Sequence, residues 1–113
     1  MMANRHRGEI SAMLDGHEWI LCLTLGTLAE LETAFEASDM GALLKRFSGS
    51  TLSAHDAARV IAAGLKGGGN PVPLEQVAQM RADGGATGFA RIVNELLTAT
   101  FGESKPEQSA ANP

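Results

Sequence analysis

Residues 17–35 constrain the fold more than any other part of this sequence, because the two halves of the stretch carry different hydrophobic periodicities. Residues 17–23 alternate in the manner of a β-strand, whose side chains point to opposite faces in turn. From residue 24 onward the large apolar side chains recur at helical spacing on one side: Leu25, Leu28, Leu31 and Phe35. We therefore predict a strand that leads directly into an amphipathic helix.

A tight turn precedes this strand. Asp15-Gly16 lies between two alternating runs, and this dipeptide favours a type I′ turn, whose two central residues both need positive φ. A two-residue turn would pair Leu14 with His17, and the register would continue to Gly8 opposite Leu23. One face of the hairpin would then carry Ile10, Ala12, Trp19, Leu21 and Leu23.

The opposite, outer face of the predicted hairpin is mixed in character. It carries Glu9, Ser11, Met13, Glu18, Ile20 and Cys22. Its apolar members are expected either to meet a partner or to lie under the C-terminal helix, because a two-stranded hairpin needs further packing to be stable.

Apolar spacing predicts a series of helices after the hairpin, at about 25–37, 39–47, 54–66, 73–81 and 86–101. The last has the clearest apolar stripe: Phe89, Ile92, Val93, Leu96, Leu97 and Phe101. The fold class is therefore α+β, with an N-terminal β-hairpin packed on a small bundle of four to five short helices.

Capping residues refine the ends of these helices. Thr27 and Glu30 form a potential capping box at the start of the first helix, and Thr24 is the competing cap one turn earlier. Ser53 predicts the start of the third helix. Gly67 is expected just after that helix ends, where a left-handed residue is common.

Length and charge set the broad class of protein. The 113 residues predict one domain at 8–102, with a flexible N-terminus at 1–7, a short linker at 48–51 and a disordered tail at 103–113. The net charge of −4 disfavours nucleic acid as the main partner. A single cysteine, no signal-peptide pattern and no membrane-length apolar run lead us to expect a cytoplasmic protein.

The sequence lacks an assembled catalytic or cofactor site. No Cys or His pair has the spacing of metal ligands, and no Lys follows the glycine runs as a phosphate loop would require. Ser53, His55 and Asp56 are the residue types of a hydrolytic triad, but neighbours on a helix point about 100° apart, so a capping role is favoured. Cys22 has apolar neighbours, typical of an inert packed thiol. We expect no enzyme activity, no metal and no cofactor.

Four segments resemble a known family, the small protein encoded beside the tail genes of gene transfer agents and related siphophages. They are NRHRGE (4–9), LCLTLGTLAELETAF (21–35), ARVIAAGLKGGGN (58–70) and GFARIVNELLTATFG (88–102). The resemblance covers roughly residues 3–102 and is most specific at 21–35, followed by 61–69. It implies a tail assembly chaperone that binds the tape measure protein and keeps its long apolar helices soluble while tail tube subunits polymerise.

Two alternatives to the chaperone stay open: a structural tail component retained in the particle, and a small regulatory adaptor, which the acidic balance disfavours. The resemblance implies the tape measure protein as partner, and tail tube subunits and a second copy of the chain are further candidates. The net charge and the lack of a membrane-length apolar run predict no nucleic acid or membrane partner. A chaperone needs accessible apolar surface for a helical client. We interpret five residues as that surface, against the alternative that each is core: Met13, Ile20, Met40, Leu44 and Phe47.

Overall fold

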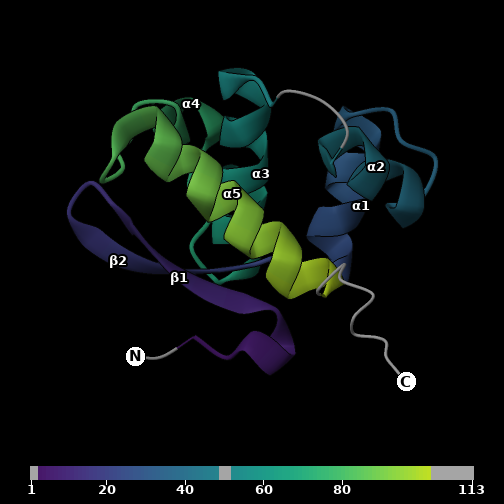
Figure 1. Ribbon diagram of the computed structural model, residues 1–113, viewed down its shortest axis with the longest axis horizontal. Coiled ribbons are helices and arrows are strands. Elements are labelled where there is room, and N and C mark those ends of the chain that lie inside the picture. Colours follow the sequence, from purple (N-terminus) through teal and green to yellow (C-terminus); the bar gives the residue numbers. More distant parts are fainter. Residues whose placement is uncertain (1–2, 49–51, 103–113) are drawn as a thin grey trace.

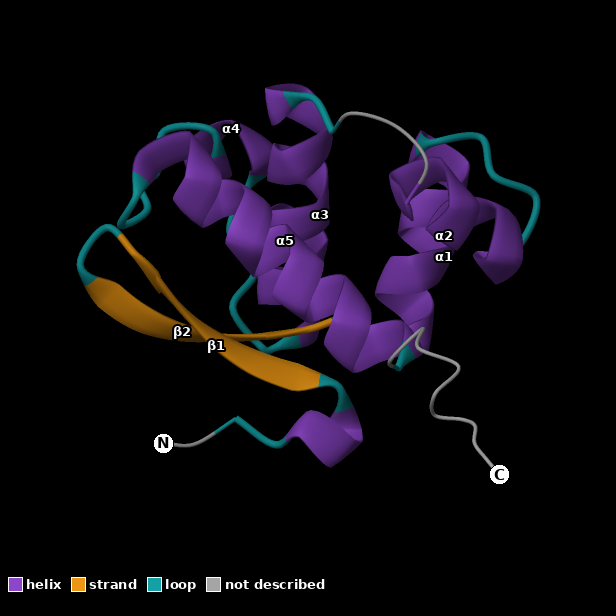
Figure 2. Cartoon of the chain, viewed as in Figure 1, coloured by secondary structure: helices purple, strands orange, loops and turns teal. Residues whose placement is uncertain are grey.

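The computed structural model describes residues 3–48 and 52–102, in which a β-hairpin lies against a group of helices (Figures 1 and 2). In chain order the elements are the 3-10 helix η1 (Arg5–Arg7), β1 (Glu9–Leu14), β2 (His17–Cys22), α1 (Leu25–Ala34), α2 (Met40–Ser48), α3 (Ala54–Gly67), α4 (Leu74–Val77) and α5 (Gly85–Phe101). The predicted α+β architecture is confirmed. The predicted tail at 103–113 and residues 49–51 of the predicted linker lie outside the described residues.

The hairpin has the register that its turn chemistry predicts. Leu14 pairs with His17, and the ladder runs without interruption to Glu9 opposite Cys22. Asp15 and Gly16 have φ values of 55° and 77°, the positive φ at both central positions that a type I′ turn needs. The expected Gly8–Leu23 pair lies beyond the ladder, since the described strands begin at residue 9 and end at residue 22.

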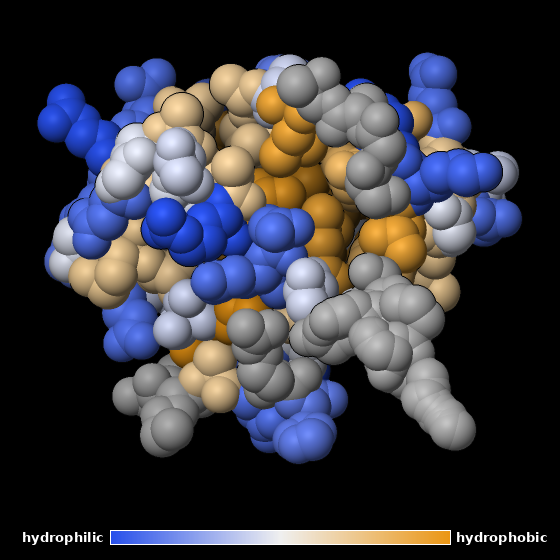
Figure 3. Space-filling view, in the orientation of Figure 1, coloured by the Kyte–Doolittle hydropathy of each residue, from blue (hydrophilic) through white to orange (hydrophobic). Residues whose placement is uncertain are grey.

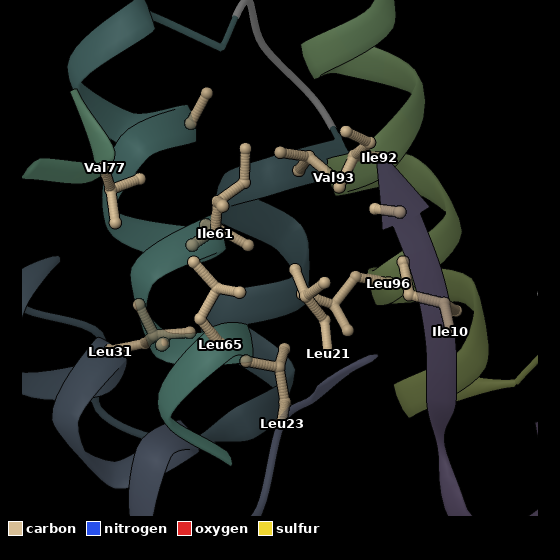
Figure 4. Close-up of a cluster of buried hydrophobic side chains, with 14 of the residues drawn as sticks. Ile10, Leu21, Leu23, Leu31, Ile61, Leu65, Val77, Ile92, Val93 and Leu96 are labelled. Atoms are coloured by element: carbon tan, nitrogen blue, oxygen red, sulfur yellow. The ribbon is translucent and has the colours of Figure 1, made fainter. Parts of the chain in front are cut away.

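The core lies between one face of the hairpin and the helices α3 and α5 (Figure 4). α3 packs mainly against β2, and α5 packs mainly against β1. The side chains of Leu21 and Leu96 both lie against Gly64 of α3, so the three elements meet at this point. The fully buried large side chains are Leu14, Leu21, Leu43, Val60, Ile61, Leu65 and Leu96.

The outer face of the hairpin is not covered by the C-terminal helix, so that sequence-based alternative is wrong. α5 lies on the inner face instead, because its single apolar stripe can bury more surface against the apolar side chains there. On the outer face Met13 is 43% exposed, and Ile20 and Cys22 are half-buried.

The C-terminal end of α3 packs on the backbone of β2 at very short range. A Cβ atom added at Gly67 would overlap the carbonyl oxygen of Cys22, and one added at Gly68 would overlap that of Ile20. At Gly64 an added Cβ would lie 2.7 Å from the Leu96 side chain. These three glycines sit at i, i+3 and i+4, so they form one face of the helix. Only a helix face without side chains can approach a strand this closely.

The end of α3 differs from its predicted form. Gly67 is still helical, and the left-handed residue is Gly69, with φ of 93°. Asn70 N–H donates to the Leu65 carbonyl at 2.7 Å, and Gly69 N–H donates to the Lys66 carbonyl at 3.1 Å. These two bonds form a Schellman motif. The left-handed residue was predicted at Gly67 and lies at Gly69, so that prediction was wrong by two residues. The helix is longer because its glycines at 67 and 68 pack against β2.

The start of α1 is capped by Thr24, and the alternative capping box is wrong. Thr27 N–H donates to Thr24 Oγ1 at 3.2 Å, and the Thr27 hydroxyl donates to the Thr24 carbonyl at 3.1 Å. Thr27 is therefore buried inside the first turn. Leu25, predicted on the apolar side, is 76% exposed because the helix begins there and leaves it outside the core.

Two further predicted segments differ from the structure. α1 ends at Ala34 rather than near residue 37, since Glu36 adopts a positive φ of 56°. Residues 3–7, predicted to be flexible, include η1, and Asn4 accepts hydrogen bonds from the N–H groups of Arg7 and Glu9 at 2.9 and 3.0 Å.

Substituting Gly67 tests the close approach of α3 to β2. We expect Gly67→Ala to destabilise the fold by about 2–3 kcal/mol, because the added methyl group overlaps the Cys22 carbonyl and the packed helix must shift. Gly26→Ala in α1 is the matched control, because nothing lies within 3.9 Å of its added Cβ. The control should stabilise the protein by about 0.4–1 kcal/mol through the unfolded state. Urea unfolding measures both, and equal effects would contradict the packing described.

Candidate functional site: a groove between helices

An apolar groove of about 780 Å³ lies between α3, α4 and α5. We call it the helical groove. Its apolar lining comes from Leu52, Ala54, Ala57, Ala58, Ile61, Leu74, Val77, Ala78, Met80, Ala86, Phe89 and Ala90. Three polar residues, Ser53, His55 and Glu75, complete its rim. The groove therefore suits an apolar occupant better than a charged metabolite.

A second hollow of about 420 Å³ continues the groove along α5 toward α2. The two share Leu52 and Ala90, and the second is also lined by Phe47, Val93 and Leu97. Figure 3 shows strongly apolar side chains recessed in a hollow in the upper middle of this face, between α5 and α2. Together the two hollows form an elongated and mainly apolar surface that follows one side of α5, and Thr87, Arg91 and Asn94 also line its second part.

Small side chains explain why the groove stays open. On α3 the lining residues Ala54 and Ala58 reach only one carbon from the backbone, and Ala86 and Ala90 do the same on α5. Neighbouring helices normally fill the space between them with interdigitating side chains. Here these four positions carry only methyl groups, so the first turns of α3 and α5 leave space between them.

One wall of the groove is held from the hairpin turn. Asp15 Oδ1 accepts a hydrogen bond from the Arg81 N–H at 2.9 Å, and the Asp15 N–H donates to the Arg81 carbonyl at 2.8 Å. Leu14 and Ala82 form an isolated antiparallel bridge beside these bonds. The wall residues Val77 and Met80 are buried just before this attachment. We call the two Asp15–Arg81 bonds the turn latch.

The turn latch also explains why the predicted helix at 73–81 is wrong. α4 is a single turn, Leu74–Val77, and the chain then leaves the helix to reach Asp15. A helix this short is not stable by itself in water. Its position therefore depends on the burial of Val77 and Met80 and on the latch.

Ser53 and His55 at the rim of the groove, and Asp56 beside them, take part in structural interactions. Ser53 Oγ accepts from the Asp56 N–H at 3.0 Å, as the predicted N-cap requires. The Asp56 carboxylate pairs with Arg46 at 3.1 Å, and His55 Nε2 accepts from Arg59 Nε at 3.3 Å. Ser53, His55 and Asp56 therefore point to three different partners and form no proton relay.

Cys22 is also in a structural setting. Its thiol donates to the Arg7 carbonyl at 3.5 Å. Burial raises the pKa of the Cys22 thiol above its usual range, the charge of Glu9 adds to the rise, and Arg7 opposes it. A raised pKa reduces the fraction of reactive thiolate, so this cysteine lacks the activation that a nucleophile needs.

The five residues predicted as a partner surface do not form one surface. Met13 and Ile20 lie on the outer face of the hairpin, and α2 lies at the opposite end of the longest axis from the hairpin turn (Figure 1). On α2, Met40 is 43% exposed, whereas Leu44 and Phe47 are half-buried.

Phe47 is the member of this set that reaches the elongated hollow. It lines the smaller hollow, and its ring also packs edge-on against the ring of Phe35, the residue that follows α1, with centroids 5.0 Å apart. Arg46 lies over the same Phe35 ring at 5.3 Å. Phe47 therefore joins α2 to α1 and forms one end of the apolar surface.

No group of three or more His, Cys, Asp or Glu side chains in residues 3–48 and 52–102 could hold a metal ion. Within the same ranges, no helix is long and apolar enough to cross a membrane.

Comparison with known families decides the wider assignment. A family model described as "Phage tail tube protein, GTA-gp10" matches residues 7–103, which include every strand and α-helix of the structure. The chain belongs to this family. The resemblance to a gene transfer agent and siphophage tail family is thereby confirmed. No curated protein and no solved structure matches the chain.

The family description names a structural protein of phage tails and no catalytic activity. The helical groove was not predicted from the sequence, although the spacing of its alanines is a signal for it. Ala54 and Ala58 repeat at i and i+4 on α3, as Ala86 and Ala90 do on α5. Matching pairs of small residues on two helices can indicate close packing or an open groove, and the structure shows the groove.

The turn latch yields a stability prediction with a matched pair of variants. Asp15→Asn keeps a side-chain oxygen acceptor and a residue that tolerates positive φ, so we expect a change within about 0.5 kcal/mol. Asp15→Gly keeps the turn but removes the acceptor, so the free energy of unfolding should fall by about 1 kcal/mol. Hydrogen exchange at the Arg81 amide should accelerate about tenfold in the Gly variant alone. Equal exchange in both variants would contradict the latch.

Proposed function

We propose that this chain is a non-enzymatic tail assembly chaperone that holds an apolar helix of the tape measure protein in the helical groove. The observation that carries the proposal is the groove itself, an open apolar channel of about 780 Å³ with a few polar groups at its rim. A concave site lined mainly by apolar side chains, with a few polar groups, is the usual form of a binding site. A family of phage tail proteins supplies the setting.

The lining of the groove supports a helical client. Amphipathic helices bind in grooves by inserting apolar side chains spaced at i, i+3 or i+4, and i+7. The methyl groups of Ala58, Ala86 and Ala90 leave space for large client side chains, and the Phe89 ring offers a broad apolar contact. The second hollow, which ends at Phe47, lengthens the surface along α5. A surface of this length suits several side chains of one helix and not a single side chain.

The outer face of the hairpin remains a second candidate contact for the same client. Met13 is exposed there, and Ile20 is half-buried beside it. Tail tube subunits are further candidates, since they assemble around the tape measure protein. We place the helix in the groove because its apolar lining is larger and is formed by three elements.

A structural tail component is the second candidate function, and the family description favours it, because that description names a tail tube protein. Mass spectrometry of purified particles separates the two proposals. A chaperone should be absent from mature particles and present in assembling cells. A structural component should be retained in the particle in a fixed ratio to other tail proteins.

Co-expression with the tape measure protein tests the groove directly. Ala90 is exposed and lines both hollows, so Ala90→Glu places a charge in the groove without disturbing the core. We expect this variant to lose co-purification of the tape measure protein by at least about tenfold, because a buried unpaired carboxylate is costly. Ala29→Glu, at an exposed helical alanine outside the lining of the described hollows, is the matched control and should bind normally.

Charged residues at Met13 and Ile20 test the hairpin in the same assay. If the double variant Met13→Glu, Ile20→Glu loses binding and Ala90→Glu does not, the client binds the hairpin and not the groove. Normal binding in all variants would overturn both surfaces. Circular dichroism of each purified variant shows whether the fold is retained.

A further inference from the structure

The rest of the chain covers the outer edge of β2 but leaves part of the outer edge of β1 open among the described residues. The outer edge of β2 is covered by the end of α3, where Asn70 Nδ2 donates to the Ile20 carbonyl at 3.2 Å. The glycine face of α3 lies against the same edge at the Ile20 and Cys22 carbonyls. No helix covers the equivalent edge of β1 in the same way among the described residues, since α5 packs on the inner face of that strand.

The register shows which backbone groups of β1 face away from β2. In a hairpin with a two-residue turn, the residues that flank the turn exchange hydrogen bonds, and the pattern then alternates along the strands. Leu14, Ala12 and Ile10 therefore bond to β2. Glu9, Ser11 and Met13 direct their N–H and C=O groups outward. The Ile20 carbonyl, opposite Ser11, confirms the alternation because it bonds to Asn70 and not to β1.

The outward groups are occupied only near the two ends of the strand. The Glu9 N–H donates to the Asn4 carbonyl at 3.0 Å, and beyond the other end the Asp15 N–H donates to the Arg81 carbonyl at 2.8 Å. Among the described residues, no hydrogen bond from outside the hairpin reaches the backbone of Ser11. The Met13 C=O faces the Leu14–Ala82 bridge. The open set is therefore the Glu9 C=O, the N–H and C=O of Ser11, and the Met13 N–H.

We propose that two copies of this chain pair through β1, antiparallel and about a two-fold axis at Ser11, to form a four-stranded sheet. The open groups are complementary to themselves under this symmetry. Ser11 of each copy would exchange both hydrogen bonds with Ser11 of the other, and each Met13 N–H would donate to the Glu9 C=O of the other copy. This pairing uses four bonds and leaves none of the open groups unpaired.

The ends of the open segment also fit this partner. The paired segment covers residues 9–13 of each copy. Gly8, with φ of 78°, turns the chain out of the strand at the point that would meet Leu14 of the other copy, where Ala82 already lies. Pairing therefore stops where the edge is already occupied.

β1 also lacks the features that protect edge strands from pairing. Natural edge strands carry Lys, Pro or a bulge, or are covered by another element. The strand EISAML has no Lys and no Pro, and its ladder with β2 is continuous. Its one charge, Glu9, would lie opposite Met13 of the second copy and not opposite another carboxylate.

Charge variants at Ser11 test the two-fold pairing, because this residue would lie opposite itself. Ser11 is exposed on the outer face, so Ser11→Lys and Ser11→Glu should leave the hairpin folded. The wild-type chain should have the mass of a dimer by light scattering or sedimentation equilibrium. Each variant alone should be a monomer, since like charges would face each other. An equimolar mixture of the two variants should restore the dimer, as a mixed pair with opposite charges.

Each other outcome overturns the proposal. A monomeric wild-type chain shows that the edge does not pair with itself, and dimers in both single variants show that another surface joins the copies. Monomeric variants that fail to associate when mixed exclude the axis at Ser11 and leave the edge to an extended segment of another protein. Co-purification of the tape measure protein is measured separately with the groove variants, so failure of self-pairing and failure of the proposed function remain distinct.

Discussion

The contact between the glycine face of α3 and the backbone of β2 is the interaction on which the rest of the structure depends. Gly64, Gly67 and Gly68 let the helix approach the strand so closely that the Ile20 and Cys22 carbonyls occupy the space of absent side chains. Asn70 then bonds to the same strand edge and completes the contact. This packing fixes the direction of α3 relative to the hairpin, and α5 packs in the angle between them.

The two ends of α3 serve different purposes as a result. Its C-terminal half has glycines and is pressed against β2, whereas its first turns have alanines and line the helical groove. α4 and the start of α5 lie beside these first turns, and the alanines there leave the groove open. The turn latch between Asp15 and Arg81 links the same hairpin to the opposite wall of the groove.

Local chemistry allowed much of the fold to be predicted from the sequence. The Asp15-Gly16 turn determines the register of the hairpin, and the apolar stripe of α5 identifies its buried side. The features that could not be predicted depend on contacts between distant residues. The length of α4 depends on a bond between Asp15 and Arg81, and the choice of hairpin face depends on which one α5 can bury more fully. Glycines at 64, 67 and 68 lie on one face of a helix, and this spacing is a signal for close packing. The same glycines belong to a run at 67–69, which taken alone indicates only the end of a helix. The groove could not be predicted because it arises where the side chains of separate helices leave space between them.

We propose that the chain binds an apolar helix of the tape measure protein in the helical groove. The most direct measurement is a nuclear magnetic resonance titration of the labelled chain with a synthetic amphipathic segment of the tape measure protein. The account predicts shift changes concentrated at Ile61, Met80 and Phe89, with residues of α1 outside the groove, such as Ala29, unchanged. Changes confined to the hairpin, or no saturable change at millimolar peptide, would contradict it.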